Sequence, residues 1–168
     1  MREEKVLTEA TVSFLEREGE ILLAKKTKKI GMGCWNGYGG GIEKGETAED
    51  SAVRELFEET NGVVARPEDL KKIAIVFFKN TKSDGRIFIC KVHFYIVKKW
   101  KGEPKETEEM TNPTWFNKQK LPFHEMMPSD KEWLPLALSG KKIIAEASLG
   151  PFQQKLLGEV KIKYVKEF

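Results

Sequence analysis

The sequence predicts a single domain of the α+β or α/β class that spans residues 1–168. Three observations support this class. Apolar runs typical of β-strands are separated by turn-forming residues, one stretch has helical periodicity, and the length suits one domain with a substantial core. Hydrophobic residues make up 40% and charged residues 33% of the chain, which is ordinary for a water-soluble globular protein.

The first elements are expected to be a hairpin and a glycine-rich loop. Strands are predicted at residues 10–15 and 21–24, and the polar turn between them contains Gly19. Residues 31–41 hold six glycines, which indicates tight turns or close approach of the backbone to a ligand. Between these features lies a basic cluster that suits either a solvated loop or a phosphate-facing role, and it comprises Lys25, Lys26, Lys28 and Lys29.

An amphipathic helix is predicted directly after the glycine-rich loop. Thr47 is a good N-cap, with Asp50 three residues later in a capping-box arrangement. Asn61 and Gly62 both tolerate the left-handed backbone conformation that ends many helices. The apolar face is expected to pack on a sheet, and it is formed by Ala48, Ala52, Val53, Leu56 and Phe57.

The rest of the chain is expected to add strands and one more helix. Asp84-Gly85 is a hairpin signal between two long apolar runs. A helix that ends near Leu138 is capped by either Ser129 or Asp130. The predicted strands cover residues 73–78, 87–97, 114–116, 143–149 and 159–165.

Three carboxylates gather on the first predicted helix. Glu55, Glu58 and Glu59 are three or four residues apart at most, so their side chains share one face. Like charges at this spacing destabilise an exposed helix by roughly 0.2–0.5 kcal/mol per pair. A divalent cation such as Mg²⁺ accounts for the cluster better than a solvated acidic face does, because hard cations bind carboxylate and phosphate oxygens.

Composition limits the partners and the location. The net charge of +3 is too mild to indicate stable nucleic-acid binding, and no apolar run approaches the length of a membrane span. Cys34 and Cys90 lack metal-ligand spacing and are read as free thiols of a reducing compartment. We therefore expect a cytoplasmic protein with a small-molecule partner, either a monomer or a dimer.

The spacing of the central residues resembles the signature of the Nudix hydrolase family. Gly40, five residues, Glu46, seven residues, then Arg54-Glu55-Leu56, one residue and Glu58-Glu59 follow its pattern. The signature's closing glycine and aliphatic residue are replaced by Asn61 and Gly62. The resemblance extends beyond the signature to the MutT-homologue, 8-oxo-dGTPase-like branch, through GCWNGYGGGIEKGET at 33–47, the EEM at 108–110, WF at 115–116, LPF at 121–123 and MPSDKEWLPL at 127–136.

This resemblance implies a mixed central β-sheet sandwiched between helices. It also implies hydrolysis of purine or oxidised purine nucleoside triphosphates, such as 8-oxo-dGTP, to the monophosphate and pyrophosphate. Mg²⁺, with Mn²⁺ as a substitute, would be held by Glu55, Glu58, Glu59, Glu109 and the carbonyl of Gly40. Arg54 would orient the helix glutamates by bidentate pairing, and Glu46 would support the turn into the helix.

The substrate-binding residues are implied by the same resemblance. Lys26 corresponds to a lysine near the phosphates, and Asn36 and Asp130 correspond to residues that read the base. The chain departs from the branch at Ser129, where an aspartate is usual, and at Met127 and Ile30, where aromatic residues are usual. Phe77 corresponds to a pocket aromatic residue, whereas Trp133 suits either the pocket or the core.

The expected reaction is attack of an activated water on phosphorus, with Glu58 or Glu59 accepting the proton. The departures in the base pocket keep a second substrate class open, namely nucleotide sugars or a broad range of nucleoside-diphosphate-linked compounds. A non-catalytic nucleotide-binding module is a third reading. It is disfavoured because Glu46 and the three helix glutamates are all present.

Overall fold

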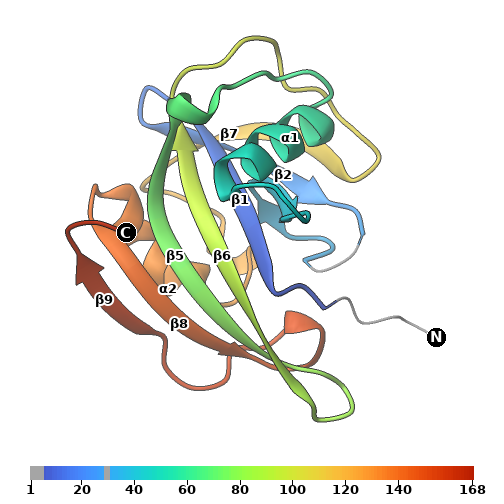
Figure 1. The fold of residues 1–168 in the computed structure, drawn as a ribbon, viewed down its shortest axis with the longest axis vertical. Helices are drawn as coiled ribbons and strands as arrows, with labels where there is room; N and C mark the ends of the chain where they lie inside the picture. Colours follow the sequence, from blue (N-terminus) through green and yellow to red (C-terminus); the bar gives the residue numbers. More distant parts are fainter. Residues whose placement is uncertain (1–5, 29–30) are drawn as a thin grey trace.

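The computed structural model describes residues 6–28 and 31–168, and Figure 1 shows how they are arranged. The two α-helices of the described residues are α1 (Ala48–Thr60) and α2 (Asp130–Leu138). Short 3-10 turns occur at η1 (Pro67–Asp69), η2 (Phe123–Glu125) and η3 (Pro151–Gln153). The strands are β1 (Glu9–Arg17), β2 (Glu20–Lys26), β3 (Trp35–Asn36), β4 (Tyr38–Gly41), β5 (Leu70–Thr81), β6 (Ile87–Val97), β7 (Met110–Asn117), β8 (Lys142–Leu149) and β9 (Lys161–Val165).

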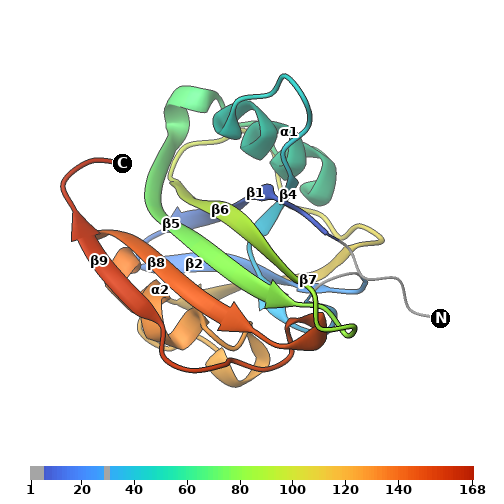
Figure 2. The same cartoon turned by 60° about the horizontal axis from the view of Figure 1, so that its bottom comes forward.

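The strands form one mixed sheet. Their order is β3-β2-β1-β6-β5-β8-β9, with β4 paired to β1 and β7 paired to β2. The β1–β6 and β5–β8 pairs are parallel, and the other pairs are antiparallel. Figure 2 shows α1 on one side of the sheet and α2 on the other. The predicted mixed sheet between helices is therefore confirmed.

Helix α1 begins and ends where the sequence predicts. The hydroxyl of Thr47 accepts a hydrogen bond of 3.0 Å from the backbone N–H of Asp50. At the other end Asn61 adopts the left-handed conformation, with φ 54° and ψ 50°. An asparagine thus ends the helix in place of the glycine of the family signature.

The predicted apolar face of α1 is partly wrong. Phe57 is 51% exposed, whereas Ala52 and Leu56 are fully buried. The buried face continues instead through Glu59 and Thr60 near the end of the helix. Because this end of α1 packs against β4, a strand in which three of the four residues are glycine, it brings a carboxylate rather than a phenyl ring into the interior.

Two strands lie where the sequence predicts only a glycine-rich loop. β4 pairs antiparallel with β1, with Gly39 opposite Val12 and Gly40 opposite Thr11. The neighbouring strand β3 pairs with β2. Through this pairing the glycines of β4 lie beside β1 and contact α1.

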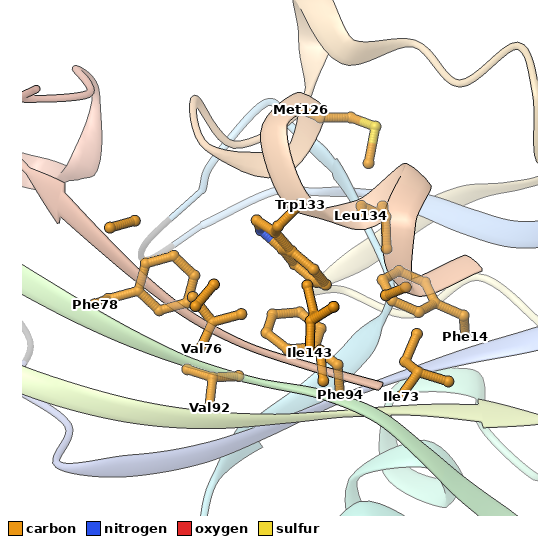
Figure 3. Packing of buried hydrophobic residues seen from close by; sticks show 14 of the residues in the cluster. Phe14, Ile73, Val76, Phe78, Val92, Phe94, Met126, Trp133, Leu134 and Ile143 are labelled. Carbon is orange, nitrogen blue, oxygen red and sulfur yellow. The ribbon is translucent and has the colours of Figure 1, made fainter. Parts of the chain in front are cut away.

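The main hydrophobic core lies between α2 and the long strands, as Figure 3 shows. Trp133 is fully buried there, with its ring centroid 4.4 Å from that of Phe94. Trp133 is thus a core residue. A second cluster around Tyr38 and Leu56 fixes α1 against β1 and β4.

Within the described ranges, no helix is both long and apolar enough to span a membrane.

Candidate active site

Glu59 connects α1 to the glycine strand β4. Its side chain lies in the last turn of the helix, and the residue is 7% exposed. Its Oε1 accepts a hydrogen bond of 2.7 Å from the backbone N–H of Gly39. The glycine strand therefore holds one of the predicted metal ligands in a fixed position.

Arg54 connects the loop before the helix to the helix glutamates. Its Nε and Nη2 donate to the two carboxylate oxygens of Glu46, at 2.8 and 2.9 Å. Its Nη1 donates to Glu55 at 3.0 Å and to Glu58 at 3.3 Å. Glu46 also accepts from the backbone N–H of Glu43, which fixes the turn as predicted. The bidentate partner of Arg54 is thus Glu46, and the helix glutamates share a single guanidinium nitrogen.

Burial raises the proton affinity of two carboxylates on α1. Burial raises the pKa of Glu59 to about 7, and it also raises the pKa of Glu55. The negative charge of Glu109 adds to the repulsion at both groups, whereas Lys26 attracts the Glu59 carboxylate. The structure therefore brings Glu109 and Lys26 close to the acidic face, as the resemblance implies.

This donor set suits a divalent cation. Glu55 and Glu59 are largely buried, and Glu109 lies close enough to repel both of their carboxylates. A divalent cation bound among these oxygens would offset that repulsion. A β-carbon added to Gly40 would lie 2.6 Å from Oε1 of Glu55, so glycine lets that carboxylate lie against the β4 backbone. Over residues 6–28 and 31–168, no three His, Cys, Asp or Glu side chains are already arranged as metal ligands.

A cavity of about 810 Å³, including its open mouth, lies on the other side of the glycine strand. Gly39 and Gly40 line it and also contact the acidic face, so β4 is the shared wall. Its polar lining residues come from separate parts of the chain and include Thr11, Lys26, Asn36, Asp130 and Gln153. Its larger apolar lining residues are Leu7, Val12, Phe78, Phe88, Val92, Phe94 and Met127.

Most of the predicted substrate-binding residues meet at this cavity. Lys26, Asn36, Met127 and Asp130 all line it. Ser129 does not: it is fully buried, and its hydroxyl has no hydrogen-bond partner among the described residues. The prediction for Ile30 lies outside the described residues.

Phe77, which the resemblance places in the pocket, does not line this cavity. Phe77 lies on the opposite face of the sheet, where Lys91 Nζ is 5.9 Å from its ring centroid. Phe78 lines the cavity instead. Adjacent residues of a strand point to opposite faces, and a bulge between Lys72 and Ala74 shifts the phase of β5.

Sequence reasoning missed further lining residues, among them Phe88, Gln153 and Leu7. Phe88 follows the Asp84-Gly85 turn at the start of β6, and Gln153 lies in the η3 turn after β8. Leu7 precedes β1. Each of these residues reaches the cavity only because distant parts of the chain pack together. No local sequence pattern marks Gln153 as a lining residue.

Asp130 makes the stability of the protein depend on pH. It is 5% exposed, and burial raises its pKa from 3.8 to about 7. In the native state the carboxyl group therefore keeps its proton up to about pH 7, whereas in the unfolded chain it ionises near pH 4. This contribution to stability is complete below pH 4 and is lost as the pH rises toward 7, at up to about 1.4 kcal/mol per pH unit.

We expect Asp130→Asn to remove that dependence. Urea unfolding at pH 5 and at pH 7.5 should show wild type losing more stability with rising pH than the variant loses. Glu132→Gln, which removes an exposed carboxylate of the same helix, is the control and should follow wild type. An equal loss in wild type and Asp130→Asn would contradict the prediction.

Comparison with known proteins agrees with this geometry. Residues 7–137 match the NUDIX domain. The chain is 37% identical over 134 residues to the oxidized purine nucleoside triphosphate hydrolase of Danio rerio, covering 80% of this chain and 81% of the relative. It is 38% identical over 132 residues to the protein of the same name from Mus musculus, covering 79% and 80%.

Solved structures show the same fold. The crystal structure of the MutT protein from Bacillus halodurans superposes with a TM-score of 0.75 at 19% identity, covering 93% of this chain and 97% of that one. The domain match takes in more than half of the chain, and the two vertebrate relatives exceed 30% identity over most of their length. The chain therefore belongs to the Nudix hydrolase family.

Proposed function

We propose that this protein is a Mg²⁺-dependent nucleoside triphosphate pyrophosphohydrolase. Its substrates would be purine or oxidised purine nucleotides such as 8-oxo-dGTP, and its products the monophosphate and pyrophosphate. The observation that supports this best is the shared wall of β4, which has an acidic helix face on one side and a cavity containing Asn36 and Asp130 on the other. The names of the two vertebrate relatives point to the same substrate class.

Nudix hydrolases generally use divalent metal ions. Glu55, Glu58, Glu59 and Glu109 would hold Mg²⁺ here, with Mn²⁺ as a substitute and the Gly40 carbonyl as a further ligand. To do so, Glu55 and Glu58 would turn from Arg54 Nη1, while Arg54 keeps its two bonds to Glu46. A bound ion would neutralise phosphate charge and make a water molecule more acidic.

The chain's own groups would then complete the reaction. Glu58 or Glu59 would take the proton as the water oxygen bonds to phosphorus and the bridging P–O bond to the leaving pyrophosphate breaks. Lys26 lies between the acidic face and the cavity, where its ammonium group would attract the triphosphate. The base would lie deeper in the cavity, where Asn36 and Asp130 supply both donors and acceptors.

The second substrate class also has support. The hydroxyl of Ser129 is buried outside the cavity, so it supplies no base contact. Fewer groups therefore remain to select a purine, and nucleotide sugars or a broad range of nucleotides would be the alternative substrates.

We further propose a cytoplasmic monomer or dimer without stable nucleic-acid binding, in keeping with the free thiols and the net charge of +3.

A substrate panel with separate detection of pyrophosphate and phosphate tests this proposal. We expect pyrophosphate from ordinary and oxidised purine triphosphates, with EDTA abolishing release and added Mg²⁺ or Mn²⁺ restoring it. Faster turnover of a nucleotide sugar would favour the alternative. Release of phosphate without pyrophosphate would show that another bond is cleaved.

A further inference from the structure

The connection between β8 and β9 forms a closed turn against the core. Its ends are joined by a bridge between Leu149 and Leu156, and the N–H of Gly150 donates to the carbonyl of Lys155 at 2.9 Å. Leu149 is fully buried, and Leu156 packs on the main core. The turn is therefore held in place, and its tip, η3, contacts β5.

The tip of this turn has an unfavourable backbone. Phe152 and Gln153 both have φ of 57°, in the left-handed region. Residues other than glycine and asparagine rarely adopt that backbone conformation, because their β-carbon crowds the backbone there. Two consecutive residues of this kind are unusual. Such backbone strain persists only where the surrounding structure holds it in place, and it is frequent at active sites and ligand-binding sites.

The strained tip forms one wall of the cavity. Gln153 is a half-buried lining residue, and so is Phe88 at the start of β6. Figures 1 and 2 both show η3 beside the β5–β6 hairpin, so the two residues approach the cavity from neighbouring hairpin ends. Lys26, Asn36 and Asp130 come instead from β2, β3 and the start of α2.

We propose that Gln153 is a specificity-determining residue whose side-chain amide binds the polar edge of the nucleobase, while Phe88 provides an apolar surface for the base to pack on. An amide can donate two hydrogen bonds and accept two, which suits the mixed donor and acceptor edge of a base. An aromatic ring at a cavity wall suits the base's flat face. This inference rests on the proposed function, since it assumes a nucleotide in the cavity.

A purely structural role makes different predictions from a binding role. If the tip served only to reverse the chain, glycine at position 153 would be preferred, because glycine adopts a positive φ without strain. Gln153→Gly should then be at least as stable as wild type and should lose nothing else. If Gln153 binds the base, the same variant should be equally or more stable and yet lose selectivity.

The test compares Gln153→Ala with Gln154→Ala, its exposed neighbour that does not line the cavity. For each variant, kcat/KM is measured for ATP, GTP, CTP and UTP. We expect Gln153→Ala to reduce the preference among the bases by about tenfold, mainly through KM, the loss expected for one or two hydrogen bonds. Gln154→Ala should keep the wild-type preference.

Two further pairs of measurements separate binding from folding. Gln153→Gly should have a urea midpoint equal to or above that of wild type and should share the lost preference of Gln153→Ala. Phe88→Ala should raise KM for every base, whereas Ile89→Ala, on the exposed opposite face of β6, should not. If preference follows stability across the variants, or if Gln153→Ala and Gln154→Ala behave alike, the proposal is wrong.

Equilibrium binding keeps the test independent of turnover. Titration with α,β-methylene analogues of the same four nucleotides measures base preference without hydrolysis. A preference in wild type that Gln153→Ala lacks supports the inference even if no pyrophosphate is ever released, an outcome that would overturn the proposed function alone. Binding without any base preference in wild type would overturn the inference while leaving the hydrolase activity intact.

Discussion

Glu59→Gln and Glu58→Gln are each expected to lower kcat by about 10²–10⁴-fold, the range for loss of a positioned general acid or base. Glutamine keeps the shape of the side chain but carries no charge to hold a cation and accepts no proton at neutral pH. At position 59 its carbonyl oxygen can still accept the N–H of Gly39, so the fold should persist. The measurement is pyrophosphate release at saturating Mg²⁺.

A titration with Mg²⁺ separates the two roles of these glutamates. A variant that recovers at high Mg²⁺ has lost a ligand, whereas one that stays slow has lost the proton acceptor. Asp50→Asn removes an exposed carboxylate from the first turn of the same helix and should retain wild-type activity. If both glutamine variants were fully active, the assignment of the acidic face as the catalytic centre would fail.

Gly39→Ala is expected to destabilise the fold more than most single substitutions, by about 3–5 kcal/mol. A β-carbon at this position would lie 1.7 Å from the carbonyl oxygen of Thr11, which is backbone and unable to turn aside. Relief of this clash requires β4 to move off β1. A chain of this size should then unfold about 6–20 °C below wild type in a thermal scan.

Gly150→Ala is the matched control for this prediction. Its φ of −77° suits any residue, and the nearest atom to an added β-carbon is 3.7 Å away. Its stability should stay within about 1 kcal/mol of wild type. A thermal midpoint for Gly39→Ala equal to that of Gly150→Ala would mean that β4 does not lie against β1 as described.

The sequence predicts best those features that depend on residues close together in the chain. The start of α1 at Thr47 and its end at Asn61 follow from local capping chemistry, and both are found where predicted. The clustering of Glu55, Glu58 and Glu59 follows from helical spacing alone. Local hydrogen bonds and helix geometry are therefore sufficient for this part of the site.

Features set by distant contacts could not be predicted in the same way. The family resemblance points to Phe77, whereas Phe78 lines the cavity, and the run of residues 73–78 contains no polar residue that would mark which side faces the interior. Glycines have low strand propensity, so β4 is identifiable only from its pairing with β1. Gln153 belongs to the same class, because its position depends on how the β8–β9 turn packs against β5.

The parallel pairing of β1 with β6 has a consequence for the order of folding. Residues 9–15 must find residues 91–97, whereas the hairpins β1–β2 and β5–β6 close locally. Contacts between distant segments carry a large loss of chain entropy and form slowly. β4 rests on β1, and the cavity is lined by residues from both β1 and β6. Refolding protein should therefore regain its hairpins well before it can bind a ligand, and newly made chains would pass through a period of being partly folded but inactive.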